Sequence, residues 1–209
     1  MRVEALNLGF SYDEDIYVFK DLNFSVGDGE LLLVVGDNGS GKTTLLQIVA
    51  LLLKPTHGKV IFDGEDPWKD PNRWRKRIGF SFQFPENQFF NFTVFDEVVY
   101  SAKNFGLDGI ERLYERSMAA FGMDPESYRN RLPFELSGGE KRKVGIASVV
   151  VHDPDLLILD EPLVSLDWPS RCEIKSFLKG WKDMGKTAVV ATHYPDFFSS
   201  IADGVLRLS

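Results

Sequence analysis

The octapeptide GDNGSGKT at residues 36–43 restricts the possible folds of this chain more than any other stretch, because it matches the pattern G-x-x-x-x-G-K-[ST]. It lies between a continuous apolar run at residues 30–35 and a segment with helical spacing at residues 41–53. Its glycines let backbone N–H groups and the positive end of the helix point at phosphate oxygens. The pattern predicts a strand, a phosphate-binding loop and a helix, with Lys42 reaching the β- and γ-phosphates and Thr43 ligating Mg²⁺.

The remaining pattern alternates strands, loops and helices. Residues 2–8 and 21–26 alternate apolar and polar side chains, which predicts half-buried antiparallel strands. We expect further strands at residues 59–62, 78–82, 156–159, 187–191 and 204–208, and helices at residues 93–105, 110–121 and after residue 137. This order predicts an α/β fold in a single domain, residues 1–209, with a parallel-rich core and a mostly helical insertion at about residues 84–136.

Composition favours one compact, cytosolic unit. The 209 residues are 44% hydrophobic, which is enough to bury a sizeable core. There is no run of roughly 18 apolar residues and no secretory signal, and the single Cys172 has no second thiol to pair with. The net charge of −7 argues against a nucleic-acid partner. We interpret the basic run at residues 73–77 as a solvated face.

A second chemical motif is the strand LLILDE at residues 156–161, which ends in two acids. Paired acids after a strand are often only solvated loop charges. Downstream of a phosphate loop, however, Asp160 is placed to hold Mg²⁺ through water, and Glu161 to orient or deprotonate an attacking water.

The third motif, LSGGE at residues 136–140, opens a helix and offers a serine and two glycines to a second phosphate site. With this motif the chain resembles the ATP-binding cassette (ABC) ATPases, whose signature is usually LSGGQ. The resemblance implies a P-loop ABC core with an antiparallel β subdomain and a helical subdomain. It also implies a head-to-tail pair of cassettes, in which Ser137 and Gly139 touch the γ-phosphate bound to the partner. Two departures are Glu140 in place of the commoner Gln, which we expect to tune contacts near the ribose, and Leu163 in place of Thr.

Smaller landmarks of the family occur in the same order. Tyr12 matches the aromatic residue that stacks on adenine, although a core or edge-strand tyrosine is the alternative. Gln83 matches the Q-loop glutamine, Asp167 lies in the D-loop sequence, and His193 matches the switch histidine that contacts the γ-phosphate.

The resemblance therefore implies three sets of site residues. The catalytic residues are Glu161, His193, Gln83 and Lys42. The nucleotide-binding residues are Tyr12, Gly36, Asn38, Gly39, Ser40, Gly41, Lys42, Thr43, Thr44, Ser137, Gly138, Gly139 and Asp167. The Mg²⁺ ligands are Thr43, Gln83 and Asp160, so that the expected cofactors are ATP and Mg²⁺.

The segment SFQFPENQFFNF at residues 81–92 is unusually aromatic. In ABC transporters the stretch after the Q-loop forms part of a groove for a helix of the membrane subunit, which would be lined here by Phe84, Phe89, Phe90 and Phe92. The alternative is that about half of these rings fill the core. The sequence PENQ at residues 85–88 also resembles the ATPases of energy-coupling factor (ECF) importers, which take up vitamins and transition-metal ions.

These resemblances predict an ATP-hydrolysing subunit that lies on the cytoplasmic face of the cell membrane and drives import through a separate membrane subunit. Whether it pairs with itself or with a related cassette stays open. The alternatives are another ABC importer or exporter, or a non-transport cassette acting on DNA or the ribosome. A single cassette without heptads and with an acidic balance disfavours the non-transport class.

Overall fold

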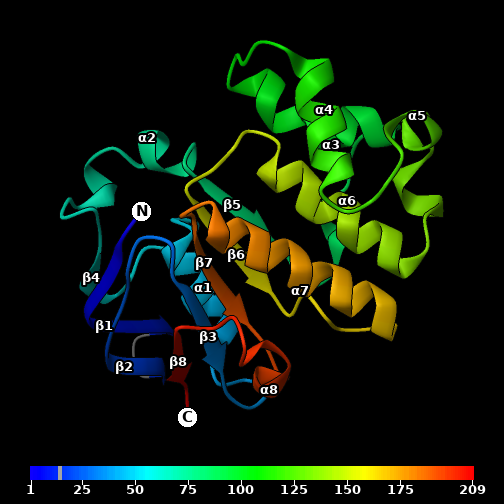
Figure 1. The fold of residues 1–209 in the computed structure, drawn as a ribbon. Coiled ribbons are helices and arrows are strands. Elements are labelled where there is room, and N and C mark those ends of the chain that lie inside the picture. Colours follow the sequence, from blue (N-terminus) through cyan, green and yellow to red (C-terminus); the bar gives the residue numbers. More distant parts are fainter. Residues whose placement is uncertain (14–15) are drawn as a thin grey trace.

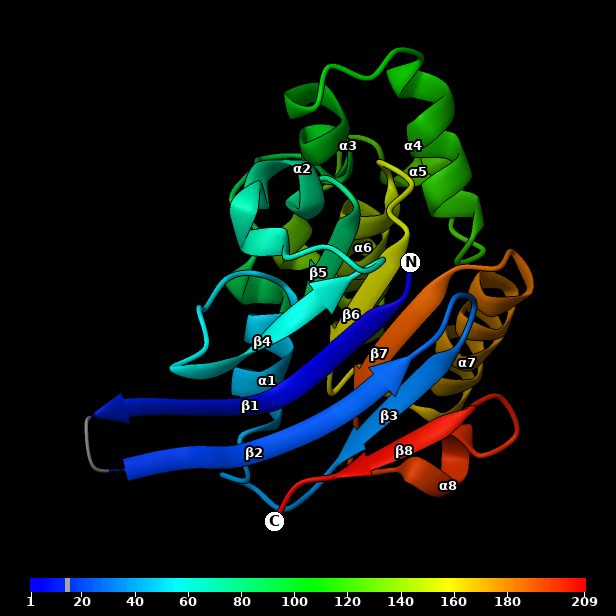
Figure 2. The same ribbon diagram turned by 90° about the vertical axis from the view of Figure 1, so that its left-hand side faces the viewer.

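Two β-sheets of different kinds organise the chain, and the computed structural model describes them over residues 1–13 and 16–209 (Figure 1). The antiparallel sheet has the order β2-β1-β4, built from β1 (Val3–Asp13), β2 (Ile16–Val26) and β4 (His57–Phe62). The parallel sheet has the order β5-β6-β7-β3-β8. Its strands are β3 (Leu31–Val35), β5 (Ile78–Ser81), β6 (Leu156–Asp160), β7 (Thr187–Ala191) and β8 (Gly204–Arg207). Figure 2 shows the long β1 and β2 crossing in front of the parallel strands.

Each face of the parallel sheet packs into its own hydrophobic core, because successive side chains of a strand point to opposite faces. Leu32 and Val34 of β3 join a core with helix α1 (Lys42–Val49) and the antiparallel sheet. Leu31 and Leu33 join the other core, with helices α6 (Gly138–Val150) and α7 (Trp168–Asp183). All five residues of β3 are buried, and the strand lies between β7 and β8. The apolar run before the phosphate loop therefore forms a central strand, as predicted.

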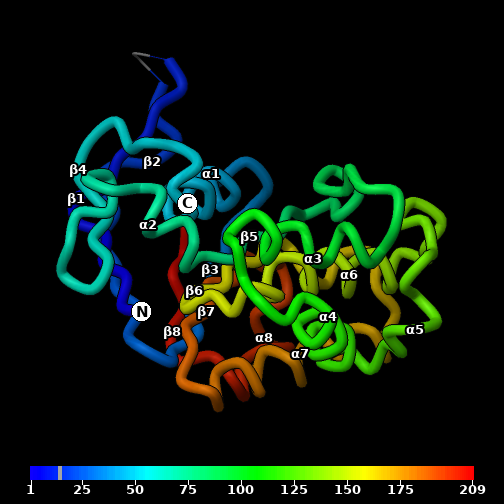
Figure 3. Tube along the Cα trace, turned by 90° about the horizontal axis from the view of Figure 1, so that it is seen from above, coloured from blue at the N-terminus to red at the C-terminus, as the bar shows by residue number. Residues whose placement is uncertain are grey.

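The chain between β5 and α6 is mostly helical and forms a lobe beside the β5 edge of the sheet (Figure 3). It contains α3 (Val94–Asn104), α4 (Ile110–Ala119) and α5 (Pro125–Tyr128), with short 3₁₀ turns at Pro85–Asn87 and Pro133–Glu135. Thr93 caps α3 by accepting the N–H of Asp96 at 3.0 Å. The buried Tyr114 of α4 donates to the carbonyl of Pro125 at 2.9 Å, which fixes α5 against α4.

Two sequence expectations about helices were incomplete. The first helix was predicted over residues 41–53 but ends at Val49, and Leu51 adopts the left-handed backbone conformation with φ 58°. The guanidinium of Arg75 donates twice to the Leu51 carbonyl, at 3.2 and 2.9 Å, and so satisfies a group that a longer helix would have paired. For the 16-residue α7 only a helical position for Cys172 was expected, and the bounds of the helix were not predicted. The remaining short helices are Pro67–Lys69, α2 (Pro71–Arg75) and α8 (Pro195–Phe198).

The basic run at residues 73–77 is largely tied to neighbouring groups. Arg73 pairs with Glu65 at 2.9 Å, and Arg77 pairs with Asp155 at 2.6 Å and Asp63 at 3.1 Å. These acids offset much of the local positive charge, in keeping with the expectation of a solvated face. In the part of the chain that the structure describes, no helix combines the length and the apolar character needed to cross a bilayer.

Candidate nucleotide-binding site

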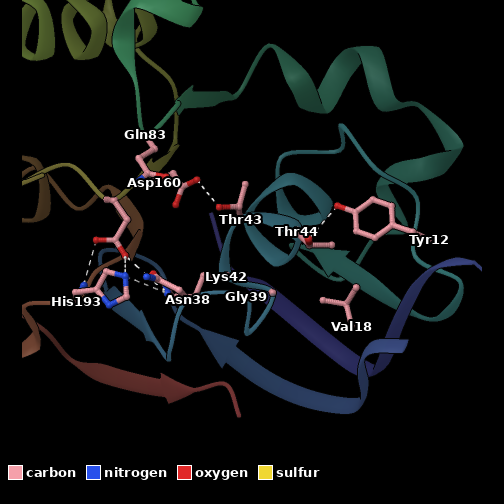
Figure 4. A pocket seen from close by; sticks show the side chains of 12 residues that line it. Tyr12, Val18, Asn38, Gly39, Lys42, Thr43, Thr44, Gln83, Asp160 and His193 are labelled. Carbon is pink, nitrogen blue, oxygen red and sulfur yellow. Dashed lines mark hydrogen bonds and ion pairs between the residues drawn. The ribbon is translucent and has the colours of Figure 1, made fainter. Parts of the chain in front are cut away.

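The carboxyl ends of the parallel strands bring the predicted groups together at one edge of the sheet. The phosphate loop follows β3, Glu161 follows β6, His193 lies two residues after β7, and Gln83 lies two residues after β5. These groups surround a cavity of about 300 Å³ (Figure 4). Its lining residues are Tyr12, Val18, Asn38, Gly39, Gly41, Lys42, Thr43, Thr44, Gln83, Asp160, Glu161 and His193.

The phosphate loop is closed around its own lysine. Nζ of Lys42 donates to the carbonyls of Gly36 at 2.8 Å and Asp37 at 3.1 Å. Gly36 itself does not line the cavity, but a Cβ at this position would lie 2.5 Å from the Ser40 hydroxyl and 2.6 Å from the Leu208 carbonyl. Gly36 and Ser40 therefore shape the loop from behind, while Asn38, Gly39, Gly41, Lys42 and Thr43 line the cavity.

The acid at the end of β6 is prepared for a cation. Asp160 is 2% exposed, and the Thr43 hydroxyl donates to its Oδ2 at 2.7 Å. Its other oxygen, Oδ1, is buried without a hydrogen-bond partner among the described residues. Burial raises the pKa of Asp160, while Thr43 and Lys42 oppose this shift. An unpaired carboxylate oxygen beside a hydroxyl and the Gln83 side chain fits the oxygen ligands that Mg²⁺ prefers.

The second acid, Glu161, is held in a strained backbone conformation. Its φ of 47° is costly for a residue with a side chain and is typical of functional sites. Its N–H donates to Ala191 at 3.0 Å, and its carboxylate, 4% exposed, accepts the backbone N–H of His193 at Oε2. Burial raises the pKa of Glu161, whereas His193 and Lys42 hold it down.

The His193 ring lies between an acid and a base. Its Nε2 is 3.1 Å from Oε1 of Glu161 and 3.5 Å from Nζ of Lys42, and the latter atom is 3.8 Å from the same Oε1. This cluster gathers a carboxylate, an imidazole and an ammonium at the phosphate end of the cavity. Any γ-phosphate held by the loop would meet all three groups.

Tyr12 and Val18 stand at the opposite end of the cavity from His193 (Figure 4). The Tyr12 ring is exposed, its hydroxyl lies 3.0 Å from Oγ1 of Thr44, and its ring meets the buried Phe10 edge-on. The core alternative therefore applies to Phe10 and not to Tyr12. Val18 was missed because its place in the cavity arises from the pairing of β2 with β1, which no local motif signals.

The LSGGE segment forms a helix start that lies outside this cavity. Ser137 caps α6: its hydroxyl accepts the Glu140 N–H at 3.3 Å, and the Glu140 carboxylate accepts the Ser137 N–H at 2.8 Å. The same carboxylate accepts the Tyr128 hydroxyl at 2.6 Å, and these bonds lower the pKa of Glu140 to about 2. The acid is thus bonded at its own helix end, and its expected influence on contacts near a ribose stays a prediction.

Besides Gly36 and Ser40, which lie behind the phosphate loop, four predicted binding residues lie outside the cavity of their own chain. Ser137, Gly138 and Gly139 are at the start of α6, and Asp167 caps α7 by accepting the Ser170 N–H at 3.1 Å. The structure therefore groups these predicted residues into two sets. One set surrounds the cavity, and the other lies at two helix starts.

The aromatic segment is divided between core and surface. Phe89 is 6% exposed and packs in the core of the lobe, which corrects its predicted place in the lining. Phe84, Phe90 and Phe92 are 47%, 60% and 85% exposed. The buried Glu97 holds this stretch in place, because its Oε2 accepts the N–H groups of Phe90 at 3.1 Å and Asn91 at 2.9 Å.

This arrangement defines a nucleoside-triphosphate hydrolase of the P-loop class, with a phosphate loop, an acid pair and a histidine at the carboxyl edge of a parallel sheet. The chain matches the ABC transporter family over residues 19–164 and belongs to it. It is similar to the energy-coupling factor transporter ATP-binding protein EcfA2 of Thermotoga maritima, with 46% identity over 198 residues, covering 92% of the chain and 74% of that protein. It is 36% identical to EcfA3 of Oenococcus oeni over 220 aligned residues, covering 100% of the chain and 76% of that protein.

Solved structures agree with this assignment. CbiO1 from Clostridium perfringens, described as part of the ABC transporter complex cbiONQ, gives a TM-score of 0.88 at 32% identity, covering 99% of this chain and 84% of that one. The dimeric post-hydrolysis cassette MJ0796 bound to ADP and Pi gives 0.89 at 28% identity, covering 99% and 94%. The expected ABC fold, ATPase activity and similarity to ECF importer ATPases are confirmed.

Proposed function

We propose that this chain is the ATP-hydrolysing subunit of an ECF-type importer that takes up a vitamin or metal ion through a separate membrane subunit. Residues 1–209 act as one cassette, with residues 84–136 as its helical lobe. The observation that carries the proposal is the joint placement of Lys42, Glu161 and His193 at the phosphate loop. The names of the ECF relatives and of the cbiONQ component support the transport assignment.

The chemistry is an in-line attack of water on the γ-phosphorus. A bond from the water oxygen to phosphorus forms as the bond to the β,γ-bridging oxygen breaks, so that ADP leaves. Glu161 orients the water and accepts its proton, and Lys42 turns from its present carbonyl partners to the phosphate oxygens. His193, beside Glu161 and Lys42, contacts the γ-phosphate. When Mg²⁺ is bound by Thr43, Asp160 and Gln83, it neutralises charge on the phosphate oxygens.

Two chains complete each site in a head-to-tail dimer. Ser137, Gly138 and Gly139 at the N-terminus of α6, with Asp167, contact the nucleotide of the partner cassette. Their position outside the cavity of their own chain supports this arrangement, as does the dimeric structure of the similar cassette MJ0796. The partner is a second copy or a related cassette.

The membrane subunit docks on the exposed rings of Phe84, Phe90 and Phe92, which places this chain at the cytoplasmic face of the membrane. Exposing three large apolar side chains within nine residues to water is unfavourable in free energy, and such exposure is typical of an interaction surface. Glu97 supports this surface from inside by fixing the backbone of Phe90 and Asn91.

The test is affinity capture of the Glu161→Gln variant from detergent-solubilised membranes with Mg-ATP, followed by mass spectrometry of the captured chains. Recovery of a polytopic membrane protein, with or without a second cassette, supports the proposal. A partner with a substrate-binding protein or an export fold would favour another ABC importer or exporter. Recovery of only soluble chains or nucleic acid would favour the non-transport class and overturn the transport assignment.

A further inference from the structure

The backbone of Phe82, the residue before Gln83, is held at its N–H by Gln88 and at its carbonyl by Arg142 of α6. The N–H of Phe82 donates to Oε1 of Gln88 at 3.3 Å, and the Phe82 carbonyl accepts from Nη1 of Arg142 at 2.8 Å. The other guanidinium nitrogen of Arg142 donates to the carbonyl of Gln83 itself. The entrance of the Q-loop is therefore fixed to a helix and not only to the end of β5.

Gln88 is in turn anchored on α6. Its Nε2 donates to the Gly145 carbonyl at 2.8 Å and to the Ser148 hydroxyl at 3.3 Å. A Cβ on Gly145 would lie 3.0 Å from that Nε2 and 3.0 Å from Cβ of Pro85. A glycine in a helix interior costs about 1 kcal/mol relative to alanine. A seat for the Gln88 amide accounts for the glycine at this position.

Arg142 supplies the second link from α6, one turn before Gly145, because residues three apart are neighbours on a helix surface. Arg142 is 3% exposed, and burial lowers its pKa to about 10, which leaves it charged at neutral pH. A guanidinium buried against two carbonyls is a costly way to stabilise a fold. Its planar fork, however, can hold two successive carbonyls in a fixed geometry that lysine cannot reproduce.

We propose that Gln88 and Arg142 are positioning residues that make Gln83 and the start of α6 move as one body. The same body then carries Gln83, which senses the nucleotide of its own chain, and Ser137, which contacts the nucleotide of the partner. Binding of Mg-ATP in one site is thereby communicated to the other site. This inference rests on the proposed head-to-tail function.

The test compares Gln88→Met and Arg142→Lys with matched controls. Asn87→Met places the same new side chain on the exposed neighbouring residue, and Arg112→Lys makes the same exchange on an exposed arginine of α4. In the Glu161→Gln background, ATP affinity is measured at chain concentrations that keep the protein monomeric, and ATP-driven dimerisation is measured by analytical ultracentrifugation. In the background with Glu161 intact, the ATP dependence of hydrolysis gives the Hill coefficient.

The expected result is a monomer ATP affinity within about twofold of the parent, dimerisation weakened by about fivefold or more, and a Hill coefficient near one. The controls keep the parent values. Dimerisation and cooperativity unchanged in both link variants would overturn the proposal. So would a fall in monomer ATP affinity as large as the fall in dimerisation, because the two residues would then merely support the cavity.

Gly145→Ala gives an independent check that leaves both link residues in place. Its added methyl group displaces the Gln88 amide, so it should weaken dimerisation as Gln88→Met does, and the combined variant should be no worse than either alone. Additive effects would contradict a shared link. If the parent protein itself failed to dimerise with ATP or to hydrolyse it, the proposed function would be refuted instead. Measurements on the parent protein alone, without any of the variants, establish that outcome.

Discussion

His193 contacts both oxygens of the Glu161 carboxylate, through its backbone N–H to Oε2 and through its ring Nε2 to Oε1, each at 3.1 Å. The two contacts have different consequences. The backbone contact orients the carboxylate whatever side chain stands at position 193. The ring contact brings a titratable group against the same acid, so it affects the charge of Glu161 as well as its position.

Glu161→Gln should bind ATP like the parent protein and hydrolyse it about 10²- to 10⁴-fold more slowly, because an amide of the same shape cannot accept the proton of water. Phosphate release and equilibrium ATP binding measure the two effects separately. Glu115→Gln, the same exchange at an exposed residue of α4, is the control. Hydrolysis at the parent rate would remove Glu161 from the mechanism.

His193→Ala should shift the acid limb of the kcat profile to higher pH. The positive charge of the imidazole lowers the pKa of Glu161, so its removal lets burial raise that pKa further. Because Glu161 must be ionised to accept a proton, the variant loses more activity at low pH than at high pH. Steady-state hydrolysis across pH tests this, and an equal loss at every pH would contradict the electrostatic role.

Asp160→Asn should stabilise the nucleotide-free protein at neutral pH by about 0.5–2 kcal/mol while weakening its response to Mg-ATP. Burial holds the folded pKa of Asp160 above the ordinary value of 3.8, so the folded state binds the extra proton and stability falls as pH rises through that folded pKa. Asparagine does not ionise, so the variant does not lose this stability as the pH rises. Urea unfolding at about pH 4 and about pH 7 measures it.

The control for that measurement is Asp108→Asn, which makes the same exchange at an exposed position. Equal stability of the parent and Asp160→Asn at both pH values, with an unchanged gain from Mg-ATP, would show that Asp160 carries neither a buried charge nor the metal.

Replacing Phe90 and Phe92 by serine should leave ATP hydrolysis by the isolated chain unchanged and reduce capture of the membrane subunit by about tenfold or more, because exposed aromatic anchors dominate such interfaces. Trp168→Ser, at an exposed ring on α7, is the matched control. Undiminished capture by the double variant would place the docking surface elsewhere on the chain.

The sequence predicted the site better than it predicted the ends of the elements. Lys42 and Asp160 were placed in the cavity by motifs that adjoin short apolar runs, and parallel strands bring such positions to one edge. His193 was assigned through its resemblance to the switch histidine of the family. The early end of α1 could not be found this way. It depends on the left-handed Leu51 and on Arg75, which lies 24 residues away in sequence.

Other omissions have different causes. The bounds of helix α7 were signalled by Asp167 before Trp168-Pro169 and by apolar residues at 174, 178 and 181, so here the available cap and spacing were overlooked. Phe89 and Phe90 could not be separated by composition, since both are apolar and adjacent. Which ring is buried and which is exposed depends on the Glu97 carboxylate, which accepts the Phe90 N–H and fixes the path of the backbone.

The order of the parallel sheet has a consequence for how the enzyme can be switched. Lys42, Glu161 and His193 follow β3, β6 and β7, each of which is hydrogen-bonded to a strand on both sides, whereas Gln83 follows the border strand β5, paired with β6. Displacing any of the first three would break backbone bonds on two sides. Displacing Gln83 disturbs strand pairing on one side only, because β5 is an edge strand. In the proposed mechanism, the strands before Lys42, Glu161 and His193 therefore stay paired, and a switch of activity acts most easily on Gln83 at the β5 edge strand, together with the helix α6 that holds it.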